Sequence, residues 1–478
     1  MYFYWLYLNP KVKVAHHFSI TIYAVSDTGG MEIIMGKPNF MKIVTCLSLI
    51  MLLVISQFLL NVFAASSTYN EKTATETVLD MGIGWNLGNT LEACGDWING
   101  KSVTDYETAW GNIVTTQAVI DGIKSAGFKT VRIPVAWSNL MSADYTINTD
   151  LLKRVKEVVD YCSNDGMYAI VNIHWDGGWF EKFATDYDEA MKKYTSIWTQ
   201  ISSYFKDYPN NLIFESLNEE GCWNSIWNRY GGTSGEAKTR AYNILNNINQ
   251  RFVDIVRASG ASNSSRCLLI AGYATDIDLT CDDCFKMPTD TINSKLIISV
   301  HYYTPPTFTI LEEDADWGKC ATTWGTEAEI NLVKTDFNKM KNKFVSKGIP
   351  VVVGEYGTTI KNKNPESVRL YISTVCKTAY DMGFCPILWD SSIHYSRSET
   401  IIKDPQLASM FLKYKEFNRV NLGDVNDDKV IDDLDYTQLK NYLLSWDNAI
   451  NEKNADINED GVVDALDLAQ LKKVLLNK

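Results

Sequence analysis

The sequence predicts a (β/α)8 barrel, an α/β fold, followed by a small all-α module. Between residues 78 and 418, eight short apolar segments alternate with helical patterns, as they do in parallel βαβ units. Several of these segments end in polar or aromatic side chains, at the edge where barrel enzymes keep their chemistry. After residue 420 the composition becomes Asp-rich, and a pattern with a period of about 32 residues occurs twice, which indicates a supersecondary repeat. The chain therefore divides into a barrel at 78–418 and a separate module at 421–478.

The expected strands are short apolar runs, and helical patterns lie between most of them. The strands cover residues 82–87, 130–134, 168–173, 212–216, 267–271, 296–300, 351–354 and 386–389. The helices cover residues 116–126, 150–162, 186–205, 236–258, 327–345, 366–382 and 406–417. Eight units over this length favour a closed barrel over an open, doubly wound sheet. No glycine-rich phosphate fingerprint follows the first strand, which argues against a nucleotide-binding sheet.

The N-terminal segment predicts a targeting signal. We expect residues 1–40 to be a mis-assigned upstream extension, because the signal begins only at Met41. Residues 41–64 have the form of a signal peptide, with a lysine, an apolar run and a small-residue end at Val-Phe-Ala64. The run is long enough to span a membrane, but no charged stop-transfer follows it. We therefore expect cleavage and secretion without stable membrane insertion, and a polar linker at 66–77.

The net charge of −13 argues against nucleic acid as a partner, because phosphate contacts need clustered Lys and Arg. Of the ten cysteines, Cys46 lies in the signal, and the others are scattered rather than arranged as a disulfide framework. Cys281 and Cys284 are the only close pair in the sequence. Since no second pair completes a metal site, a local disulfide or two free thiols is the better interpretation.

Two of the expected strands end in glutamates. Residues 212–220 pass from an apolar run into Asn218 and Glu219, and residues 350–357 end in the same way at Glu355. Two carboxylates about 5–5.5 Å apart can hydrolyse a glycosidic bond with retention, one attacking the anomeric carbon and the other protonating the leaving oxygen. The alternative is that both glutamates form buried ion pairs that stabilise the barrel ends.

Residues at other strand ends favour the catalytic interpretation. Arg132 near Glu355 would keep that carboxylate ionised, and Tyr303 can do the same by donating a hydrogen bond. Glu219 has to be protonated at the start, which a partly apolar site and the charge of Glu355 favour. Two histidines also stand at strand tips. A lone histidine there is usually structural, but two of them beside glutamates are harder to dismiss.

These motifs together resemble family 5 glycoside hydrolases, the large cellulase family, and they occur in the family's order along residues 77–417. They are Met81-Gly-Ile-Gly-Trp-Asn-Leu-Gly-Asn-Thr90, Val131-Arg-Ile-Pro134, Asn172-Ile-His174, Leu217-Asn-Glu219, His301-Tyr-Tyr303, Gly354-Glu355 and Trp389. The resemblance implies that Glu219 is the acid/base and Glu355 the nucleophile of a retaining mechanism. Many relatives have proline after the Asn-Glu pair, where this chain has Glu220, which changes the geometry of the next loop turn and adds a charge.

The resemblance also implies a set of substrate-binding residues around the two glutamates. They are Arg132 and Tyr303, which would hold Glu355; Asn218, which would bind the sugar 2-hydroxyl; His174 and His301, which would line the cleavage subsite; and Trp389, which would supply a stacking floor.

Further tryptophans fall in strand-to-helix loops on the catalytic side. Trp175 and Trp179 follow the third strand, and Trp223, Trp227 and Trp324 lie in later loops. Flat apolar faces of sugars stack on such rings, so we expect Trp175 and Trp179 to bind substrate. A buried loop anchor is the competing interpretation for each of them.

Each copy of the C-terminal repeat has the ligand spacing of a calcium loop, at loop positions 1, 3, 5, 9 and 12. The oxygen ligands are Asp424, Asn426, Asp428, Asp432 and Asp435 in the first copy and Asp456, Asn458, Asp460, Asp464 and Asp467 in the second. Gly461 stands where the second loop turns sharply, and Lys429 stands there in the first, which predicts weaker binding. We expect two calcium ions. A solvated acidic tail is the alternative, but both the spacing and the Leu-rich helices are duplicated.

The loops lack an entering helix and end in Asp where EF-hands use Glu, and this combination resembles a type I dockerin. The resemblance implies attachment through a cohesin domain of a scaffolding protein to an extracellular cellulosome. The pairs Asp433-Leu434 and Ala465-Leu466 stand at positions that dockerins commonly use for cohesin choice. Because the two pairs differ, the cohesin-binding faces formed by the two repeats need not be equivalent.

The leading interpretation is a secreted, cellulosomal endo-β-1,4-glucanase that acts on cellulose or related β-glucans and needs no cofactor for catalysis. Mannanase, xyloglucanase and mixed-linkage glucanase activities remain open on the same barrel. A non-catalytic carbohydrate-binding component is disfavoured because both glutamates are present. A calcium sensor would explain the C-terminal module but not the barrel.

Overall fold

The structure is a computed structural model. It describes residues 22–25, 31–34, 72–100, 102–221, 223–231, 235–416, 422–428, 431–446, 449–458 and 461–476. The expected signal at 41–64 lies outside these residues, as do Lys429 and Asp460. Within the expected upstream extension, β1 (Ile22–Val25) and β2 (Met31–Ile34) pair antiparallel. No helix among the residues described has both the length and the apolar character to cross a membrane.

Eight parallel strands close into a barrel in the order β10-β3-β4-β5-β6-β7-β8-β9. The strands are β3 (Gly84–Asn86), β4 (Thr130–Ile133), β5 (Tyr168–Asn172), β6 (Leu212–Glu215), β7 (Leu268–Ala271), β8 (Leu296–Tyr302), β9 (Val351–Tyr356) and β10 (Cys385–Leu388). Each lies within the segment predicted for it or departs from that segment by one or two residues. The predicted (β/α)8 barrel is confirmed.

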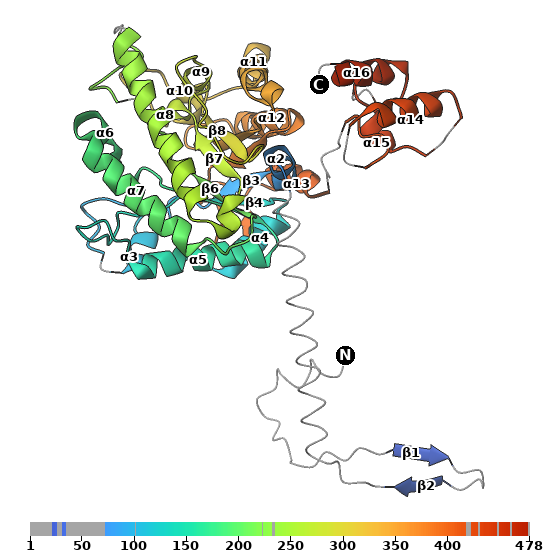
Figure 1. Cartoon of the computed structure of the whole chain (residues 1–478), viewed down its shortest axis with the longest axis horizontal. Helices are drawn as coiled ribbons and strands as arrows, with labels where there is room; N and C mark the ends of the chain where they lie inside the picture. The colour runs from blue at the N-terminus through green and yellow to red at the C-terminus, as the bar shows by residue number, and fades with distance from the viewer. Residues whose placement is uncertain are drawn as a thin grey trace. The chain divides into compact units, whose positions relative to one another are not determined.

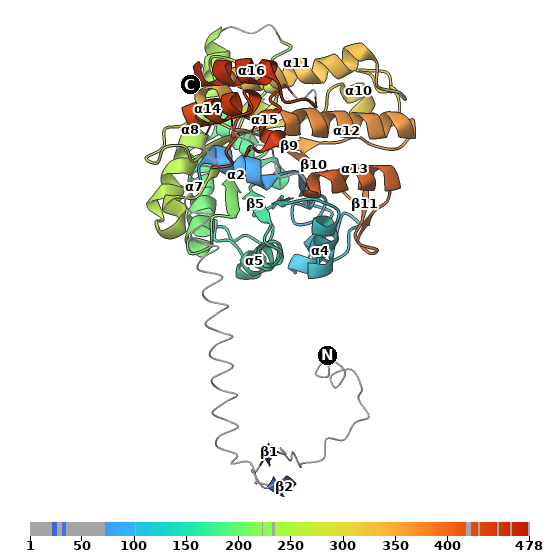
Figure 2. The same ribbon diagram turned by 90° about the vertical axis from the view of Figure 1, so that its right-hand side faces the viewer.

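Helices surround the strands (Figures 1 and 2). The longer ones are α4 (Gln117–Ser125), α5 (Thr149–Asn164), α7 (Tyr187–Tyr204), α8 (Gly235–Ala258), α11 (Glu327–Lys343), α12 (Pro365–Asp381) and α13 (Pro405–Glu416). Short helices are α3 (Val103–Glu107), α6 (Lys182–Thr185), α9 (Ile277–Thr280), α10 (Pro306–Thr309) and the 3-10 turns η1 (Asp176–Glu181), η2 (Ala261–Ser264), η3 (Tyr273–Thr275) and η4 (Val345–Lys347). A ribbon of β11 (Tyr395–Ser396) and β12 (Ile401–Ile402) follows β10.

Local sequence explains where several helices begin. Thr326 and Glu329 form a capping box at the start of α11, each side chain satisfying a backbone N–H of the other. Asn364 caps α12, and Pro365 fills the first helical position, where a missing N–H costs nothing. Each cap contributes roughly 1 kcal/mol, so the local sequence favours these helix starts in addition to the packing against the strands.

One domain boundary differs from the prediction. The linker expected at 66–77 is helical from Ala74, because α2 covers Ala74–Met81 and starts at a capping box of Thr73 and Glu76. Ala74, Val78 and Met81 are fully buried. They cluster with side chains from the strands, namely Tyr168, Ile170, Ile213, Cys267, Leu269, Ile297, Val352, Cys385 and Ile387. The helix therefore closes the apolar end of the barrel interior, and it belongs to the barrel domain.

The opposite end of the barrel interior is polar. Asn86, Arg132, Glu215 and Ser299 come from four different strands and are all fully buried. Because buried polar groups are stable only when hydrogen-bonded, this layer requires mutual partners. Those partners organise the site described below.

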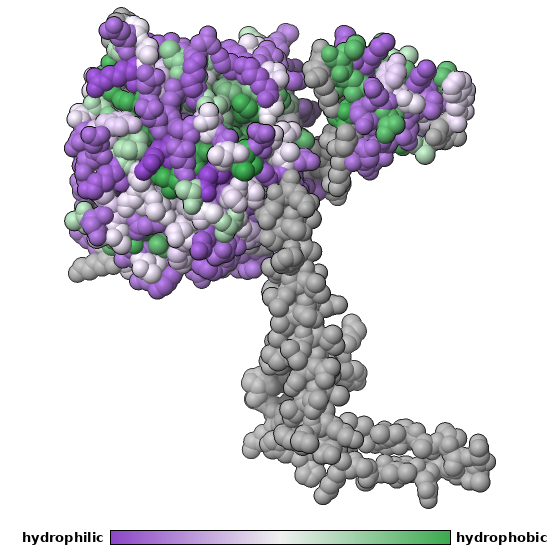
Figure 3. Space-filling model, viewed as in Figure 1, coloured by the Kyte–Doolittle hydropathy of each residue, from purple (hydrophilic) through white to green (hydrophobic). Residues whose placement is uncertain are grey.

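The C-terminal module contains α14 (Asp433–Leu443), α15 (Glu452–Ala455) and α16 (Ala465–Leu476). Its small core consists of Val425, Leu439, Ala455 and Leu471. Leu439 and Leu471 come from α14 and α16, so the two predicted repeats pack on one another through equivalent helices. Leu434 and Leu466 of the module are each more than half exposed. The face of the barrel domain seen in Figure 3 is, by contrast, mostly hydrophilic.

The cysteines present in the described part of the chain are all free thiols. Cys281 and Cys284 do not form a disulfide, which resolves the alternative left open by the sequence. The Cys281 thiol instead lies 3.6 Å from the sulfur of Met340.

Candidate active site

The structure brings most of the predicted site residues together where the strands end. Arg132 lies on β4, and His174 follows β5. Asn218 and Glu219 follow β6. The remaining residues are His301 on β8, Tyr303 directly after it, Glu355 on β9 and Trp389 directly after β10. All of them lie at the C-terminal mouth of the barrel, as the strand-end argument predicts.

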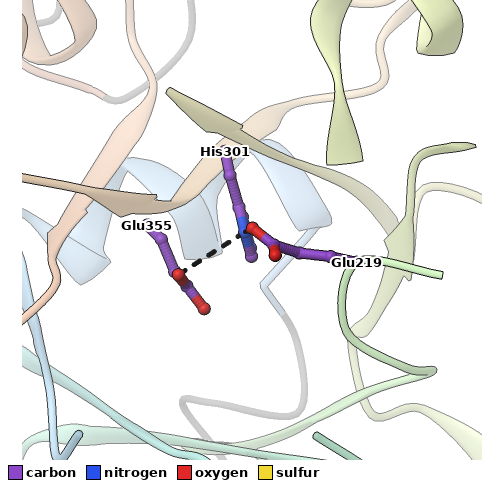
Figure 4. A group of neighbouring side chains, drawn as sticks. All are labelled: Glu219, His301 and Glu355. Carbon is purple, nitrogen blue, oxygen red and sulfur yellow. Dashed lines mark hydrogen bonds and ion pairs between the residues drawn. The ribbon is translucent and has the colours of Figure 1, made fainter. Parts of the chain in front are cut away.

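Glu219, His301 and Glu355 form the centre of this site (Figure 4). Nδ1 of His301 lies 2.7 Å from Oε1 of Glu219 and 3.7 Å from Oε2 of Glu355. One oxygen from each carboxylate and one imidazole nitrogen lie within 4.8 Å of one another. The Glu219 side chain is 48% exposed and that of Glu355 is 7% exposed. One carboxylate therefore borders solvent, while the other lies on the floor of the site.

Arg132 organises the floor of the site. Its Nη1 donates to Oε1 of Glu355 at 2.8 Å, and its Nη2 donates to Oδ1 of Asn218 at 2.9 Å. Tyr303 donates its hydroxyl to the second oxygen, Oε2, of Glu355 at 2.9 Å. Both oxygens of Glu355 thus accept hydrogen bonds that stabilise the anion. Arg132 also fixes Asn218, the residue before Glu219.

The structure explains why a glycine, Gly354, precedes Glu355. The register between β8 and β9 shifts here, so that Val300 pairs with Val353 but His301 pairs with Glu355. Gly354 is the extra residue of this bulge, and bulges re-aim neighbouring side chains. A Cβ at Gly354 would lie 2.8 Å from Oγ of Ser299 and 3.1 Å from Nε2 of His301. Only glycine leaves room for both side chains at their observed positions.

The pKa values of the two glutamates respond to different neighbours. Burial raises the pKa of Glu355, and the charges of His301 and Arg132 oppose that rise. Desolvation also acts on Glu219, but the hydrogen bond and charge of His301 outweigh it and lower the pKa of Glu219. This differs from the expectation that the surroundings of Glu219 raise its pKa, because the sequence did not show that His301 contacts Glu219 directly.

His174 and Trp389 form one side of the site. Their rings stack with centroids 5.7 Å apart and planes 8° from parallel. Nδ1 of His174 lies 3.3 Å from the side-chain nitrogen of Asn172. Burial, followed by the charge of Arg132, holds the pKa of His174 well below its usual range, so the ring is neutral. A neutral, stacked imidazole leaves the negative charge of the site on the glutamates.

The tryptophans predicted to bind substrate separate into two groups. Trp175 is 52% exposed, so its ring is available to a ligand. Trp179 is only 9% exposed, stacks on Phe180 at 4.1 Å and donates Nε1 to Asp176 at 2.7 Å. This packing favours the loop-anchor interpretation for Trp179 and corrects its expected place on the substrate surface. Trp223, Trp227 and Trp324 are buried as well.

Sequence reasoning missed three buried residues that complete the network. Glu215 accepts from Nε of Arg132 at 2.6 Å and from the hydroxyl of Ser299 at 3.0 Å. Asn86 accepts from Nη1 of Arg132 at 3.0 Å and donates to the carbonyl oxygen of Gly354 at 2.9 Å. A signal was present, since a Glu inside the run Leu-Ile-Phe-Glu is rarely buried unless it is paired.

The three central side chains are also of the kinds that bind metal ions. The neighbours of Glu355 argue against that use. One of its oxygens already faces the guanidinium of Arg132 and the other the hydroxyl of Tyr303. A second cation beside Arg132 would be repelled. The arrangement suits proton transfer and nucleophilic attack.

The predicted calcium loops have buried carboxylates that need a cation. Asp435 and Asp467 are fully buried, and neither forms an ion pair within the described part of the module. Each instead accepts backbone N–H groups, at 2.8 Å from Asp432 and 2.8 Å from Asp464 respectively. Gly461 has a φ of 87°, as the sharp turn requires. Buried carboxylates without a cation are costly, so this donor set fits a hard divalent ion such as calcium.

Comparison with known proteins assigns both parts of the chain. The family model for Cellulase (glycosyl hydrolase family 5) matches residues 91–394, and the model for the Dockerin type I domain matches residues 422–476. Endoglucanase A of Paenibacillus barcinonensis is 36% identical over 360 residues, covering 69% of this chain and 86% of the relative. A xyloglucan-specific endo-beta-1,4-glucanase of Bacteroides ovatus is 32% identical over 331 residues, covering 65% of this chain and 63% of the relative.

A solved structure shows the same similarity. A GH5-4 broad specificity endoglucanase from an uncultured bovine rumen ciliate has 36% sequence identity and a TM-score of 0.65, covering 72% of this chain and 98% of that one. The dockerin domain is a calcium-binding, cohesin-binding type that associates enzymes with cellulosomes. The chain therefore belongs to glycosyl hydrolase family 5, is a glycoside hydrolase, and carries a type I dockerin domain.

Proposed function

We propose that this protein is a secreted, cellulosomal endo-β-1,4-glucanase that works with retention, with Glu355 as nucleophile and Glu219 as acid/base. The observation that carries the proposal is the separation of the two carboxylates. Their facing oxygens lie within 4.8 Å of each other. Retaining enzymes have separations of about 5–5.5 Å, whereas inverting enzymes need about 6.5–9.5 Å to admit a water molecule.

The hydrogen bonds divide the two roles. Glu355 is ready to attack the anomeric carbon as an anion, because Arg132 and Tyr303 each donate to one of its oxygens. As the glycosyl bond to Glu355 forms, the bond from that carbon to the leaving oxygen breaks, and Glu219 gives this oxygen a proton. In the second step Glu219 removes a proton from water, which attacks the same carbon and releases Glu355.

The hydrogen bond between Glu219 and His301 is the proton source that we propose for the first step. A contact of 2.7 Å between a carboxylate oxygen and an imidazole nitrogen requires one shared proton. Arg132 and Tyr303 point to Glu355 and cannot supply it. Glu219, with half of its side chain facing solvent, is the carboxyl that can pass this proton to a bound leaving group.

Aromatic and polar side chains that follow β5, β6 and β10 support a β-glucan as substrate. The ring of Trp175 is exposed. Trp389 is half-buried, and the ring of His174 stacks on one of its faces. Asn218 uses Oδ1 for Arg132, which leaves its amide N–H groups for a sugar hydroxyl. The names of the similar endoglucanases favour cellulose or related β-1,4-glucans. Xyloglucan is the second candidate, because one similar protein is named as specific for it.

The dockerin domain supports the rest of the proposal. We infer two calcium ions, one for each loop, held by Asp424, Asn426, Asp428, Asp432 and Asp435 and by Asp456, Asn458, Asp460, Asp464 and Asp467. The exposed Leu434 and Leu466 suit contacts with a cohesin domain of a scaffolding protein. Such an assembly is extracellular, which agrees with the expected signal at 41–64.

Replacing Glu355 with Gln tests the central assignment. Glu355→Gln should lower kcat on soluble cellulose derivatives by more than about 1,000-fold, because the covalent step is lost. Glu327→Gln, an exposed position on α11, is the matched control and should keep full activity. A Glu355→Gln enzyme that still cleaves normally would refute the nucleophile assignment. Product sizing on cellulose, xyloglucan, mixed-linkage glucan and mannan then identifies the substrate.

A further inference from the structure

The loop that carries Glu219 is tied to the next loop of the barrel. The carbonyl oxygen of Glu220 accepts from the backbone N–H of Ala274 at 2.8 Å. Gly221 lies against the ring of Tyr273, where a Cβ would come within 3.1 Å of ring atoms. The carboxylate of Glu219 itself is half exposed and touches His301. The backbone of this loop is therefore positioned from η3, the turn at Tyr273–Thr275.

This turn has an unusual backbone. Ala274 and Thr275 are consecutive residues with φ of 50° and 47°, in the left-handed region. A β-branched residue such as Thr275 strongly disfavours that region. Such conformations persist only where their surroundings hold them, and they cluster at functional sites.

The surroundings of the turn explain how it is held. Tyr273 is fully buried, and its ring stacks on Tyr242 with centroids 4.1 Å apart. Trp223 and Trp227 meet the same ring edge-on. Trp223 and Trp227 belong to the loop that begins with Glu219, so this aromatic cluster joins the two loops from the inside while the Ala274–Glu220 hydrogen bond joins their backbones.

The same turn forms a wall of a cavity that opens beside Glu219. The cavity has a volume of about 240 Å³, and its lining includes Glu219, Ala274, Thr275, Asp276, Tyr303 and Thr304. Glu355 and Trp389 do not line it. Because the acid/base contacts the leaving oxygen, a cavity that borders Glu219 but not Glu355 can receive the leaving-group sugar. Carboxylate and hydroxyl groups in its lining suit sugar hydroxyls.

We propose that the Ala274–Thr275 turn positions the acid/base Glu219 against the oxygen of the leaving-group sugar, and that this sugar occupies the adjacent cavity. The inference rests on the proposed function, since it takes Glu219 as the acid/base. Ala274 and Thr275 are positioning residues: they act through the backbone of Glu220 and Gly221, which sets where the Glu219 carboxyl lies.

Leaving-group dependence distinguishes this role from a merely structural one. A natural sugar leaves only if its oxygen is protonated, whereas 2,4-dinitrophenolate leaves without protonation. Gly221→Ala pushes the loop off Tyr273, so it should lower kcat/KM on cellotetraose by about 100-fold, the range of a lost general acid. The burst of dinitrophenolate from 2,4-dinitrophenyl β-cellobioside, which reports formation of the glycosyl-enzyme, should change by less than about 3-fold.

Two further variants complete the experiment. Ala274→Gly/Thr275→Gly introduces no clash and frees the turn, so it should show the same selective loss, at about 10-fold, even if Gly221→Ala folds poorly. Gly348→Ala is the matched control: Gly348 is also left-handed, with φ of 76°, but has no atom within 4 Å of an added Cβ. It should leave both substrates unaffected.

The outcomes separate the two proposals. Glu219→Gln should show the selective loss on cellotetraose if Glu219 is the acid. Should it slow both substrates equally, the acid/base assignment itself fails. If Glu219→Gln is selective but the Gly221 and Ala274/Thr275 variants slow both substrates alike, the turn is merely structural and the positioning inference is overturned while the proposed function stands.

Discussion

Arg132 donates through Nε to Oε2 of Glu215 at 2.6 Å, and neither side chain has any exposed surface. The same guanidinium also holds Glu355, so its positive charge is divided between two carboxylates. Glu215→Gln keeps an oxygen that can accept from Nε but removes one negative charge. The charge of Arg132 then acts more fully on Glu355, and the pKa of Glu355 falls.

The acid limb of the kcat/KM profile checks this first prediction. Because Glu355 acts as an anion, a lower pKa keeps it active to lower pH, so the limb should move towards acid. The free energy of unfolding should fall by about 3 kcal/mol, since the buried Arg132 loses a counter-ion. Ser299→Ala removes the other hydrogen bond to Glu215 without changing charge, and it should not move the limb. A limb displaced towards alkali in Glu215→Gln would contradict the division of charge.

Glu215 also shows what the sequence did and did not reveal about the site. Short apolar runs that alternate with helical patterns predicted the eight strands, and the C-terminal ends of two of these strands predicted Glu219 and Glu355. Both signals are local in the sequence. The pairing of Arg132 with Glu215 and Asn86, and of Ser299 with Glu215, depends on which side chains point inward at one level of a closed barrel. That level is set by the stagger between strands, which no single segment of sequence records.

The two tryptophans after β5 should respond differently to replacement. Trp175→Ala removes an exposed ring, so it should raise KM for cellooligosaccharides several-fold and leave the thermal midpoint almost unchanged. Trp179→Ala opens a cavity beside Phe180 and should lower the free energy of unfolding by about 3–5 kcal/mol. Thermal denaturation and initial rates on both variants measure this. Equal destabilisation by the two replacements would show that Trp175 is also a loop anchor.

The tryptophan loops, like the linker, mark where local pattern is insufficient. A Trp in a strand-to-helix loop fits a sugar platform and a buried anchor equally well, and only the packing of Phe180 and Asp176 against Trp179 distinguishes them. The start of α2 could be predicted from the sequence, since Thr73 and Glu76 have capping-box spacing. The polar composition of residues 66–77 favoured a linker instead of a helix.

Stability should depend on pH through Glu92. This carboxyl is 2% exposed, and burial raises its pKa to about 7 from an ordinary value of 4.5. The folded protein therefore binds a proton between these values that the unfolded chain has lost, so the contribution of Glu92 is complete below pH 4.5 and is lost as pH rises through 7. The size of the loss is on the order of 3 kcal/mol.

Comparing the wild type with Glu92→Gln measures this contribution. The difference in free energy of unfolding between the two proteins should change in favour of Glu92→Gln as the pH rises from about 4.5 to 7, because only the wild type has a proton to lose. Glu327→Gln, which replaces an exposed carboxyl, should show no such trend against the wild type. A difference that is constant with pH would mean that Glu92 is already ionised in the folded protein.

Calcium removal should separate the two parts of the chain. Asp467 accepts backbone N–H groups of Ile457, Asn458 and Asp464, at 2.7, 3.0 and 2.8 Å, so its carboxylate holds described residues from the first and last parts of the second loop. Without calcium the buried negative charges repel one another, and the module should lose helix and cohesin binding. The barrel has its own core, and Glu219 and Glu355, the proposed catalytic residues, lie outside the module, so hydrolysis of soluble substrate should persist in EDTA.

Circular dichroism, cohesin capture and hydrolysis rates, each followed against EDTA concentration, test the separation. Asp467→Ala should mimic chelation of the second site and weaken cohesin capture, whereas Lys472→Gln, at an exposed position on α16, should bind cohesin and calcium normally. The two loops are joined by the Asn454 side chain, which donates to the carbonyl oxygen of Asp424 at 2.7 Å, so loss of one ion should weaken the other site. Hydrolysis that falls in parallel with cohesin capture would show instead that the module supports the barrel.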